Sequence, residues 1–360
     1  MIFIGDIASP NEALTTCLDR VFLENEAIFT NKKIICNFEG LVFDGSQSEK
    51  NEPVLYNHPS VIKTLNRGRK PVLCLSNNHI LDIPEQFDPT LSLLKGEGII
   101  FTGAGRTKAE AETPAIFNDG GKTIILFNAC WDFLLYNHRN PREGVYIAEI
   151  NEISLIRNVK IYKMNQPAAS IIVFLHWSLD LETLPFPIYR QFSKNIIEAG
   201  ASLVIGSHSH CIQGGEKHKD GYIVYSLGNF FIPHNIFAKG KIVYPEFSNT
   251  ELVLDWDSIG NTAKCHWFKY QHDGIQPTLI HLGSEDFDTS ALLKTHSPFQ
   301  GMTDEEYYPY YKKNRRKKIL IPVFRNYNYR VTNRIYTMLL KSRARFARFL
   351  AQQNLIKWQS

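Results

Sequence analysis

Several features of specialised protein classes are missing from this chain of 360 residues. No stretch approaches the roughly 20 consecutive apolar residues that a membrane-spanning helix needs. The first six residues have no basic region ahead of a long apolar segment, so we predict a buried strand there and not a signal peptide. Internal repeats and low-complexity segments are also lacking. These absences favour a globular, cytoplasmic protein.

Cysteine is sparse, and its spacing excludes the common paired motifs. The six cysteines form no C-x-x-C pair, and most of them lie inside apolar runs. Free cysteine is among the most buried residue types. We therefore expect small, reduced core residues and no disulfide framework or zinc cluster, which fits a reducing compartment.

Acidic residues are absent from the C-terminal part of the chain. Residues 311–360 hold 14 Lys and Arg and no Asp or Glu, whereas the other 310 residues hold 26 basic and 36 acidic residues. The net charge of +4 thus conceals an acidic body and a basic tail. A nucleic-acid partner is not expected, because the body is acidic and no reader motif is present.

Short apolar runs alternate with helical patterns over the first 230 residues, which predicts an α/β domain. We expect strands at residues 2–4, 34–37, 72–76, 99–102, 123–128, 171–176, 203–206 and 223–226. Helices are expected at residues 11–23, 59–66, 89–96 and 187–199. Residues 249–283 read as an antiparallel meander. The predicted organisation is a domain over 1–283, an irregular linker with a basic cluster over 284–330, and a basic amphipathic helix over 331–360.

Polar side chains able to bind metal follow several of the predicted strands. In an α/β sheet, the carboxyl ends of parallel strands meet at one edge, so residues distant in sequence can converge there. His208 and His210 are two residues apart, and in an extended segment both would point the same way. The mixed nitrogen and oxygen set suits Mn²⁺, Fe²⁺, Zn²⁺ or Ni²⁺ better than Ca²⁺. The candidate ligands are Asp6, Glu39, Asn78, His176, His208 and His210.

Each candidate ligand also has a purely structural explanation. An Asp after a strand often caps a helix, and Glu39 could sit in a solvated turn. Asn78 could occupy a left-handed loop position, and a single His at a strand end is usually a hydrogen-bonded structural residue. The repetition of such residues at one strand end after another is what favours a metal site.

These residues resemble the CapA family, whose members are associated with capsule and poly-γ-glutamate synthesis. The resemblance spans residues 2–231, and its segments occur in the family's order. The matching segments are Gly5-Asp6-Ile7, Asn37-Phe38-Glu39, Asn77-Asn78-His79, His176-Trp177, Gly206-Ser207-His208-Ser209-His210 and Ser226-Leu227-Gly228-Asn229-Phe230. The resemblance implies a metallophosphoesterase-like α/β/β/α sandwich, here with a C-terminal basic helical extension.

The resemblance also implies roles for individual residues. Glu39 would bridge two metals, with Asn78, His176 and His208 completing one site and Asp6 and His210 holding the other. His79 would be a general acid oriented by Asp82, and Asn229 would contact substrate. One departure weakens the second site, because Ala8 stands where metallophosphoesterases usually carry a His. Whether one or two divalent ions bind is therefore left open.

Two functions remain open from the sequence. The first is a metal-dependent hydrolase of phosphate esters or related anionic groups, acting on a small-molecule or polymer substrate in capsule or exopolymer synthesis, with poly-γ-glutamate or polysaccharide as the polymer. The second is a non-catalytic assembly subunit with a structural or vestigial metal site. The basic tail could lie against the acidic body, contact anionic lipid peripherally, or dock on polymer-synthesis enzymes.

Overall fold

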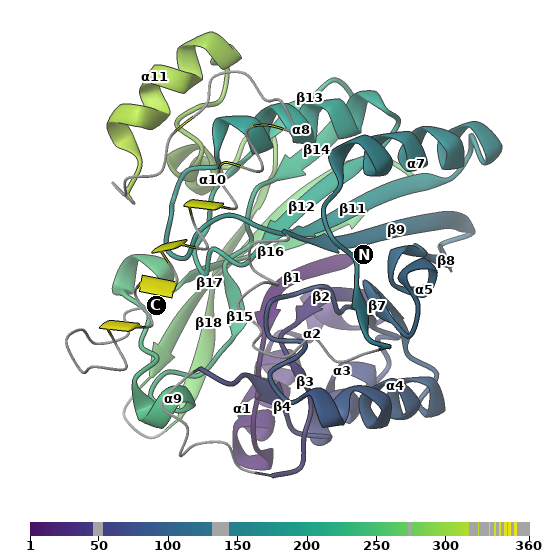
Figure 1. Cartoon of the computed structure of the whole chain (residues 1–360), viewed down its shortest axis with the longest axis vertical. Helices are drawn as coiled ribbons and strands as arrows, with labels where there is room; N and C mark the ends of the chain where they lie inside the picture. The colour runs from purple at the N-terminus through teal and green to yellow at the C-terminus, as the bar shows by residue number, and fades with distance from the viewer. Residues whose placement is uncertain are drawn as a thin grey trace.

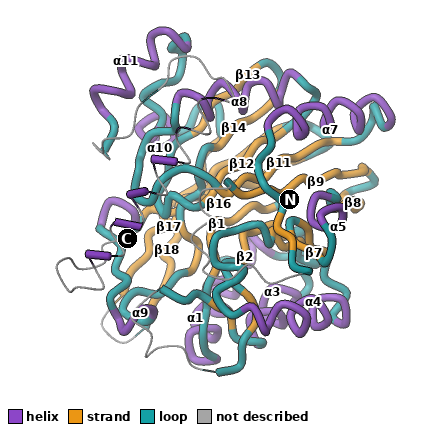
Figure 2. The backbone as a smooth tube through the Cα atoms, in the orientation of Figure 1, coloured by secondary structure: helices purple, strands orange, loops and turns teal. Residues whose placement is uncertain are grey.

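Two β-sheets pack face to face, with helices covering both outer surfaces (Figure 1). The computed structural model describes residues 1–45, 53–131, 144–272 and 276–316, together with single positions between 323 and 350. Figure 2 shows the strands of both sheets lying between the layers of helices. The α/β/β/α sandwich expected from the sequence is confirmed. None of the described helices is both long and apolar enough to cross a bilayer.

The eight-stranded sheet combines a parallel half with an antiparallel half. Its order is β18-β17-β16-β1-β2-β5-β6, and β15 also pairs with β1. From β1 to β6 the strands are parallel, whereas β16, β17 and β18 form the predicted antiparallel meander. The bounds are β1 Ile2–Ile7, β2 Ile34–Phe38, β5 Val72–Cys74, β6 Ile100–Thr102, β15 Asn229–Phe231, β16 Thr250–Asp257, β17 Thr262–His272 and β18 Pro277–Asp286.

The six-stranded sheet has a parallel centre between two antiparallel edge strands. Its order is β13-β14-β12-β11-β9-β8. The pairs β14–β12, β12–β11 and β11–β9 are parallel. The bounds are β8 Ala115–Asp119, β9 Lys122–Cys130, β11 Ser170–His176, β12 Leu203–Ser207, β13 Gly215–His218 and β14 Gly221–Val224. Two short pairs lie apart from both sheets, β3 (Leu41–Val42) with β4 (Tyr56–Asn57) and β7 (Ala104–Gly105) with β10 (Tyr146–Ile147).

Strand alternation divides the hydrophobic core into layers. Successive side chains of a strand point to opposite faces, so a strand that is apolar on both faces serves two layers. On β2, Ile34 and Cys36 pack beneath the helices, whereas Ile35 lies between the two sheets. All six cysteines are buried, as predicted, and none of them forms a disulfide.

The helices cover the outer faces as the sequence patterns indicated. Apolar residues of α1 (Glu12–Glu24), α3 (Ser60–Asn66) and α4 (Phe87–Gly96) pack with the eight-stranded sheet, and those of α7 (Glu152–Asn165) and α8 (Pro187–Glu198) pack with the six-stranded sheet. The helix α7 was not predicted, because it exposes Ile153, Ile161 and Met164 and so lacks a clear apolar stripe. Shorter elements are α2 Glu26–Phe29, α5 Lys108–Glu112, α9 Phe237–Gly240 and the 3₁₀ turns Pro84–Gln86 and Glu246–Ser248.

Residues 284–316 are ordered, contrary to the predicted irregular linker. Strand β18 extends to Asp286, and two helices follow, α10 (Ala291–His296) and α11 (Asp304–Asn314). A capping box between Thr303 and Glu306 starts α11. Tyr307 and Tyr311 are buried in the core beneath the six-stranded sheet. Most of the helix predicted over 331–360 lies outside the described residues, so it stays a prediction.

A buried ion pair fastens this C-terminal part to the body. Arg190 of α8 is only 1% exposed and binds Glu216 of β13 through two nitrogens, at 2.7 and 2.8 Å. The hydroxyl of Tyr225 donates to the same carboxylate at 2.6 Å. Arg190 also donates to the carbonyl oxygen of Met302 at 2.7 Å, just ahead of α11. One guanidinium therefore joins α8, β13 and the start of α11.

Replacing Arg190 with methionine is expected to destabilise the fold by about 3–5 kcal/mol, because Glu216 would be left buried without its cation. Urea unfolding followed by circular dichroism measures the loss. Lys194→Met is the matched control, since Lys194 of α8 pairs with the partly exposed Asp304 of α11 at 2.7 Å. This variant should cost less than about 1 kcal/mol. A loss below about 1 kcal/mol in Arg190→Met would show that the pair does not fasten the segment.

Candidate metal centre

The predicted ligands meet where strands of both sheets end. Asp6 lies on β1, Glu39 follows β2, and His176 is the last residue of β11. The Nε2 atom of His176 lies 3.5 Å from Oε1 of Glu39 and 2.7 Å from Oδ1 of Asn78. The three ligand atoms of Asp6, Glu39 and His176 lie within 4.8 Å of one another, and all three side chains are fully buried.

The two remaining histidines reach the site by a different backbone path from the one expected. Strand β12 ends at Ser207, and both His208 (φ 86°) and His210 (φ 52°) adopt left-handed conformations instead of extended ones. Their rings nevertheless converge, with centroids 5.6 Å apart, and Nδ1 of His210 lies 3.5 Å from Oδ2 of Asp6. The backbone N–H of His208 donates to the same oxygen at 3.2 Å. All six predicted ligands are thus brought to one place.

Hydrogen bonds from the surrounding residues fix the ligands in place. Asn37 donates to Oδ1 of Asp6 at 2.8 Å and to Oε1 of Glu39 at 2.7 Å, so one amide holds both carboxylates. Asn229, predicted to contact substrate, is 5% exposed, and its Oδ1 lies 2.7 Å from Nδ1 of His210. Such partners orient a histidine for metal binding. The sequence analysis had no role for Asn37, although it shares a strand face with Glu39.

The electrostatics of the centre fit a divalent cation. Burial and then the charge of Asp6 raise the pKa of Glu39 to about 8, and burial also raises the pKa of Asp6. Burial lowers the pKa of His208 to about 4, and the pKa of His176 lies well below its usual value for the same reason. Neutral imidazole is the form of histidine that binds a metal. The charge of a bound ion would also stabilise the ionised carboxylates of Asp6 and Glu39, which are crowded without it.

Two buried atoms at this centre have no hydrogen-bond partner among the described residues. They are Oε2 of Glu39 and Nδ1 of His208. An unpaired buried polar atom costs about 1–3 kcal/mol, so native structures rarely leave one without a reason. An ion bound by these side chains would supply such a reason, and the donor set therefore fits a divalent metal.

His79 and Asp82 form the pair expected of a general acid and its orienting carboxylate. Nδ1 of His79 lies 2.6 Å from Oδ2 of Asp82, and Nε2 lies 3.9 Å from Oε2 of Glu39. Burial alone would lower the pKa of His79, but the charge and hydrogen bond of Asp82 and the charge of Glu39 outweigh it and raise the pKa to about 9. The imidazole is therefore protonated at neutral pH.

The backbone at this edge is strained. Four non-glycine residues in two neighbouring loops have left-handed φ angles: Ser178 (82°), Leu181 (57°), His208 and His210. The loops are joined by a hydrogen bond from the N–H of Leu181 to the carbonyl of Ser209 at 2.7 Å. Strained positions persist only where surrounding contacts enforce them, and they cluster at functional sites.

Glycine at position 178 should relieve this strain, so Ser178→Gly is expected to be about 1 kcal/mol more stable than Ser178→Ala. Both variants lose the hydrogen bond between Gln213 and Ser178, which makes the pair a clean comparison. Thermal unfolding measures the difference. At Ser193, inside α8, the order should reverse, because glycine is disfavoured in a helix. Equal stabilities at position 178 would argue that the conformation there carries no strain.

One carboxylate near the centre escaped the sequence analysis. Asp180 lies in the loop after β11, four residues beyond His176, and its Oδ1 is 3.2 Å from Nε2 of His208. The strand pattern ends at His176, so nothing in the spacing indicated that the loop folds back over the histidines. The signal that could have found it is the acidic residue itself, close behind a predicted ligand.

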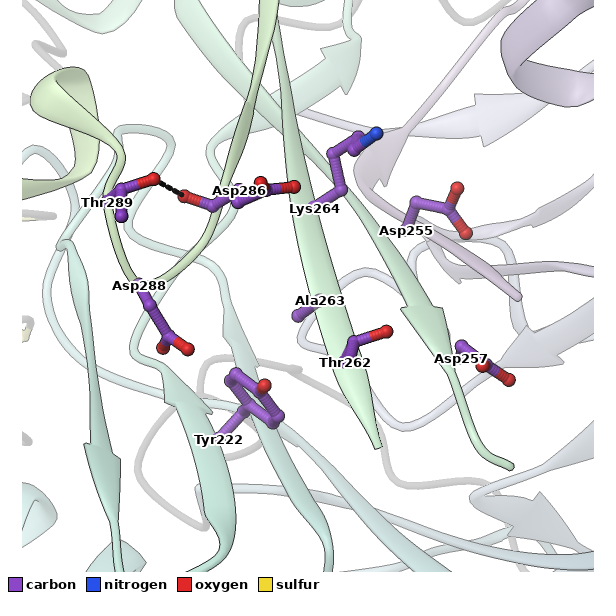
Figure 3. A pocket seen from close by; sticks show the side chains of 9 residues that line it. All are labelled: Tyr222, Asp255, Asp257, Thr262, Ala263, Lys264, Asp286, Asp288 and Thr289. Carbon is purple, nitrogen blue, oxygen red and sulfur yellow. Dashed lines mark hydrogen bonds between the residues drawn. The ribbon is translucent and has the colours of Figure 1, made fainter. Parts of the chain in front are cut away.

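A separate cavity lies at the opposite end of the eight-stranded sheet. It has a volume of ≈ 590 Å³ and is lined by residues of β14, β16, β17 and β18 and by the segment after β18 (Figure 3). Two of the acidic lining residues form ion pairs: Asp255 binds Lys32 at 2.5 Å, and Asp288 binds Lys217 at 2.6 Å. Asp255 is paired with Ile2 at the start of β1, whereas Asp6 lies near its end. The cavity is therefore not part of the candidate metal centre.

Comparison with known proteins agrees with the expected family. Residues 2–234 match a family model described as "Bacterial capsule synthesis protein PGA_cap". The capsule biosynthesis protein CapA of Bacillus anthracis is 25% identical over 174 residues, covering 47% of this chain and 42% of that protein. The PGA biosynthesis protein CapA of Bacillus subtilis is 27% identical over 239 residues, covering 63% and 62%. The chain thus spans about half the length of the curated relatives it matches.

Similarity to solved structures is weak. The sulfate thiohydrolase SoxB of Thermus thermophilus superposes with a TM-score of 0.39 and 14% identity, covering 82% of this chain and 47% of that chain. A score below 0.5 is too low to transfer function.

Proposed function

The chain belongs to the bacterial capsule synthesis protein family PGA_cap, and from this premise we propose that its metal centre hydrolyses phosphate esters or related anionic groups during capsule or exopolymer synthesis. One observation carries the proposal: Nε2 of His79, whose Nδ1 pairs with Asp82 at 2.6 Å, lies 3.9 Å from a buried carboxyl oxygen of Glu39 in the candidate metal-binding set. A proton donor beside a metal centre is the arrangement that ester hydrolysis requires.

Six side chains would hold one or two divalent ions, of Mn, Fe, Zn or Ni. A bound ion of this kind polarises an anionic oxygen and lowers the pKa of water. The residues of the chain supply the rest. Asn37 holds the carboxylates of Asp6 and Glu39 in place by donating a hydrogen bond to each, and Asn229 orients His210. His79 donates its Nε2 proton to the leaving oxygen, while Asp82 keeps the other proton on Nδ1. The metal ligands are Asp6, Glu39, Asn78, His176, His208 and His210.

A non-catalytic assembly subunit is the second candidate, and Ala8 favours it. This residue is fully buried and offers no ligand where the wider superfamily carries a His, so the site is poorer in donors than that of a typical phosphoesterase. In that case the centre is structural. The protein would then act through its partners, which include polymer-synthesis enzymes and, through the basic C-terminal segment, an anionic membrane surface on the cytoplasmic side.

Metal removal tests the first candidate directly. The purified chain is analysed for bound metals, stripped with a chelator, and assayed on phosphomonoesters, phosphodiesters and nucleotides before and after Mn²⁺ or Zn²⁺ is restored. We expect hydrolysis that disappears on stripping and returns on reloading. Hydrolysis that is unaffected by stripping would reject the proposal. Metal binding without hydrolysis of any compound in the panel would favour the assembly subunit.

A further inference from the structure

We propose that Asp180 is a metal ligand which, with His208 and His210, forms a second ion site that does not need a side chain at position 8. This inference rests on the proposed metal centre and adds a ligand to it. One donor atom from each of these three residues lies within 4.8 Å of the other two. Ligand atoms bound to one ion at about 2.1 Å lie roughly 3.4 Å apart, and Oδ1 of Asp180 is 3.2 Å from Nε2 of His208.

The carboxylates and histidines of the centre therefore divide into two groups of three. Asp6, Glu39 and His176 form the deeper group, and Asp180, His208 and His210 form the outer one. The two groups adjoin, because the rings of His176 and His208 have centroids 4.7 Å apart. This division differs from the one that the family resemblance implied, in which His208 joined Glu39 and His176.

The position of Asp180 is enforced by the loop that carries it. Ser178 and Leu181, on either side of it, both have left-handed φ angles, so the chain reverses tightly at Asp180. The N–H of Leu181 donates to the carbonyl of Ser209, between the two histidines. The fully buried Gln213 donates to Oγ of Ser178 at 2.8 Å and to the carbonyl of Glu182 at 2.7 Å. Both ends of the loop are thus fastened beside the His208–His210 segment.

The ring of His208 is buried and incompletely hydrogen-bonded. His208 is 4% exposed, and its Nδ1 atom has no hydrogen-bond partner among the described residues. Histidines that are buried for structural reasons normally have both ring nitrogens paired. Its Nε2, on the opposite edge of the ring, is the atom that faces Asp180 and would bind the outer ion, and the rings of His176 and His210 pack beside it.

The chemistry of the outer group defines the ion that it takes. One carboxylate and two imidazoles suit Zn²⁺, Fe²⁺ or Mn²⁺, and not Ca²⁺, which prefers oxygen ligands alone. The side chain of Asp180 is 43% exposed, whereas those of the deeper group are fully buried. The outer ion would therefore keep a coordination position open to solvent, as catalytic metals do and structural metals do not.

Asp180→Asn tests the assignment, because it keeps the shape of the side chain and removes its charge. The full chain is stripped with a chelator and titrated with Zn²⁺ alone, with bound metal counted by elemental analysis, and with Co²⁺, whose absorption reports coordination. We expect two ions in the wild type. The variant should retain the first ion with affinity changed less than about twofold and bind the second at least about 100-fold more weakly. Asp288→Asn, which removes a half-exposed carboxylate paired with Lys217, should match the wild type.

The outcomes separate this inference from the proposal on which it rests. Two ions in Asp180→Asn, bound as tightly as in the wild type, would overturn the role of Asp180. A single ion in both proteins would overturn the outer site and leave the deeper one intact. No ion in the wild type would overturn the metal centre itself. Because Asp180 is partly exposed, the variant should melt within a few degrees of the wild type, which thermal unfolding verifies.

Discussion

Replacing Glu39 with glutamine is expected to abolish metal stabilisation and, at the same time, make the chelator-treated protein more stable at alkaline pH. The glutamine removes a negative charge that the deeper ligand group needs. It also removes the crowding of two buried carboxyl groups, which together with burial raises the pKa of Glu39 to about 8. The same substitution therefore removes a metal ligand and relieves an unfavourable interaction between buried carboxyl groups in the metal-free fold.

The pH dependence of this effect has a definite sign. The pKa of Glu39 is about 8 in the folded chain and near 4.5 when unfolded, so its contribution to stability is fully present below about pH 4.5 and lost as the pH rises through 8. With chelator, the free energy of unfolding of Glu39→Gln should exceed that of the wild type by about 4–5 kcal/mol at pH 9, and by less than about 1 kcal/mol at pH 5. Urea unfolding at several pH values measures both. With saturating Zn²⁺ the order should reverse, because only the wild type gains binding energy.

The matched control for Glu39→Gln is Glu24→Gln, which changes an exposed carboxylate at the end of α1. Its stability difference should not depend on added metal. If Zn²⁺ stabilised Glu39→Gln and the wild type equally, the deeper site would not contain Glu39.

Replacing His79 with glutamine is expected to reduce kcat on a phosphate ester by 10²–10⁴-fold while leaving metal content unchanged. Nε2 of His79 lies 3.9 Å from Oε2 of Glu39, so in the proposed reaction His79 would donate a proton without being needed to hold the ion. Steady-state kinetics tests the loss in kcat, and elemental analysis of the same preparation tests the unchanged metal content. The control is His218→Gln, which removes a surface histidine paired with Glu198 on the six-stranded sheet.

Asp82→Asn then distinguishes a proton donor from a residue of merely structural importance. The charge and hydrogen bond of Asp82 help to raise the pKa of His79 to about 9. Without them, His79 should lose its proton at lower pH, and the alkaline limb of the rate profile should move down by about one unit. An unmoved alkaline limb would show that His79 is not the acid. Normal capsule formation in cells that carry His79→Gln would favour the assembly subunit.

Much of the fold was predictable because the strands have two buried faces. Continuous apolar runs such as residues 171–176 identify central parallel strands, and the convergence of ligands follows from the common edge at which such strands end. The helix α11 was not predicted, because its sequence is mostly polar. Only Tyr307 and Tyr311 are buried, and they pack in the same core cluster as residues of α8. The local sequence of α11 cannot show that it packs against α8, which lies more than 100 residues earlier in the chain.

The convergence of the candidate ligands was predictable, but their arrangement into two groups was not. The sequence shows which residues follow strands; it does not show how a loop turns after the strand ends. Asp180 is held beside His208 by the hydrogen bond from the N–H of Leu181 to the carbonyl of Ser209, which joins the loop after β11 to the loop after β12. The left-handed conformations of His208 and His210 were likewise hidden, because neither residue type requires them.

The hydrogen bonds of Arg190 to Glu216 and to the segment ahead of α11 limit where the chain can be truncated for expression. The family match ends at residue 234, and a conventional boundary would fall near the end of the meander. A fragment cut there would lose the carbonyl partners of Arg190 and uncover the core that Tyr307 and Tyr311 close, where the hydroxyl of Tyr307 donates to the carbonyl of Pro185. A fragment that keeps these contacts must therefore extend at least through α11, which ends at Asn314, well beyond the region that identifies the family.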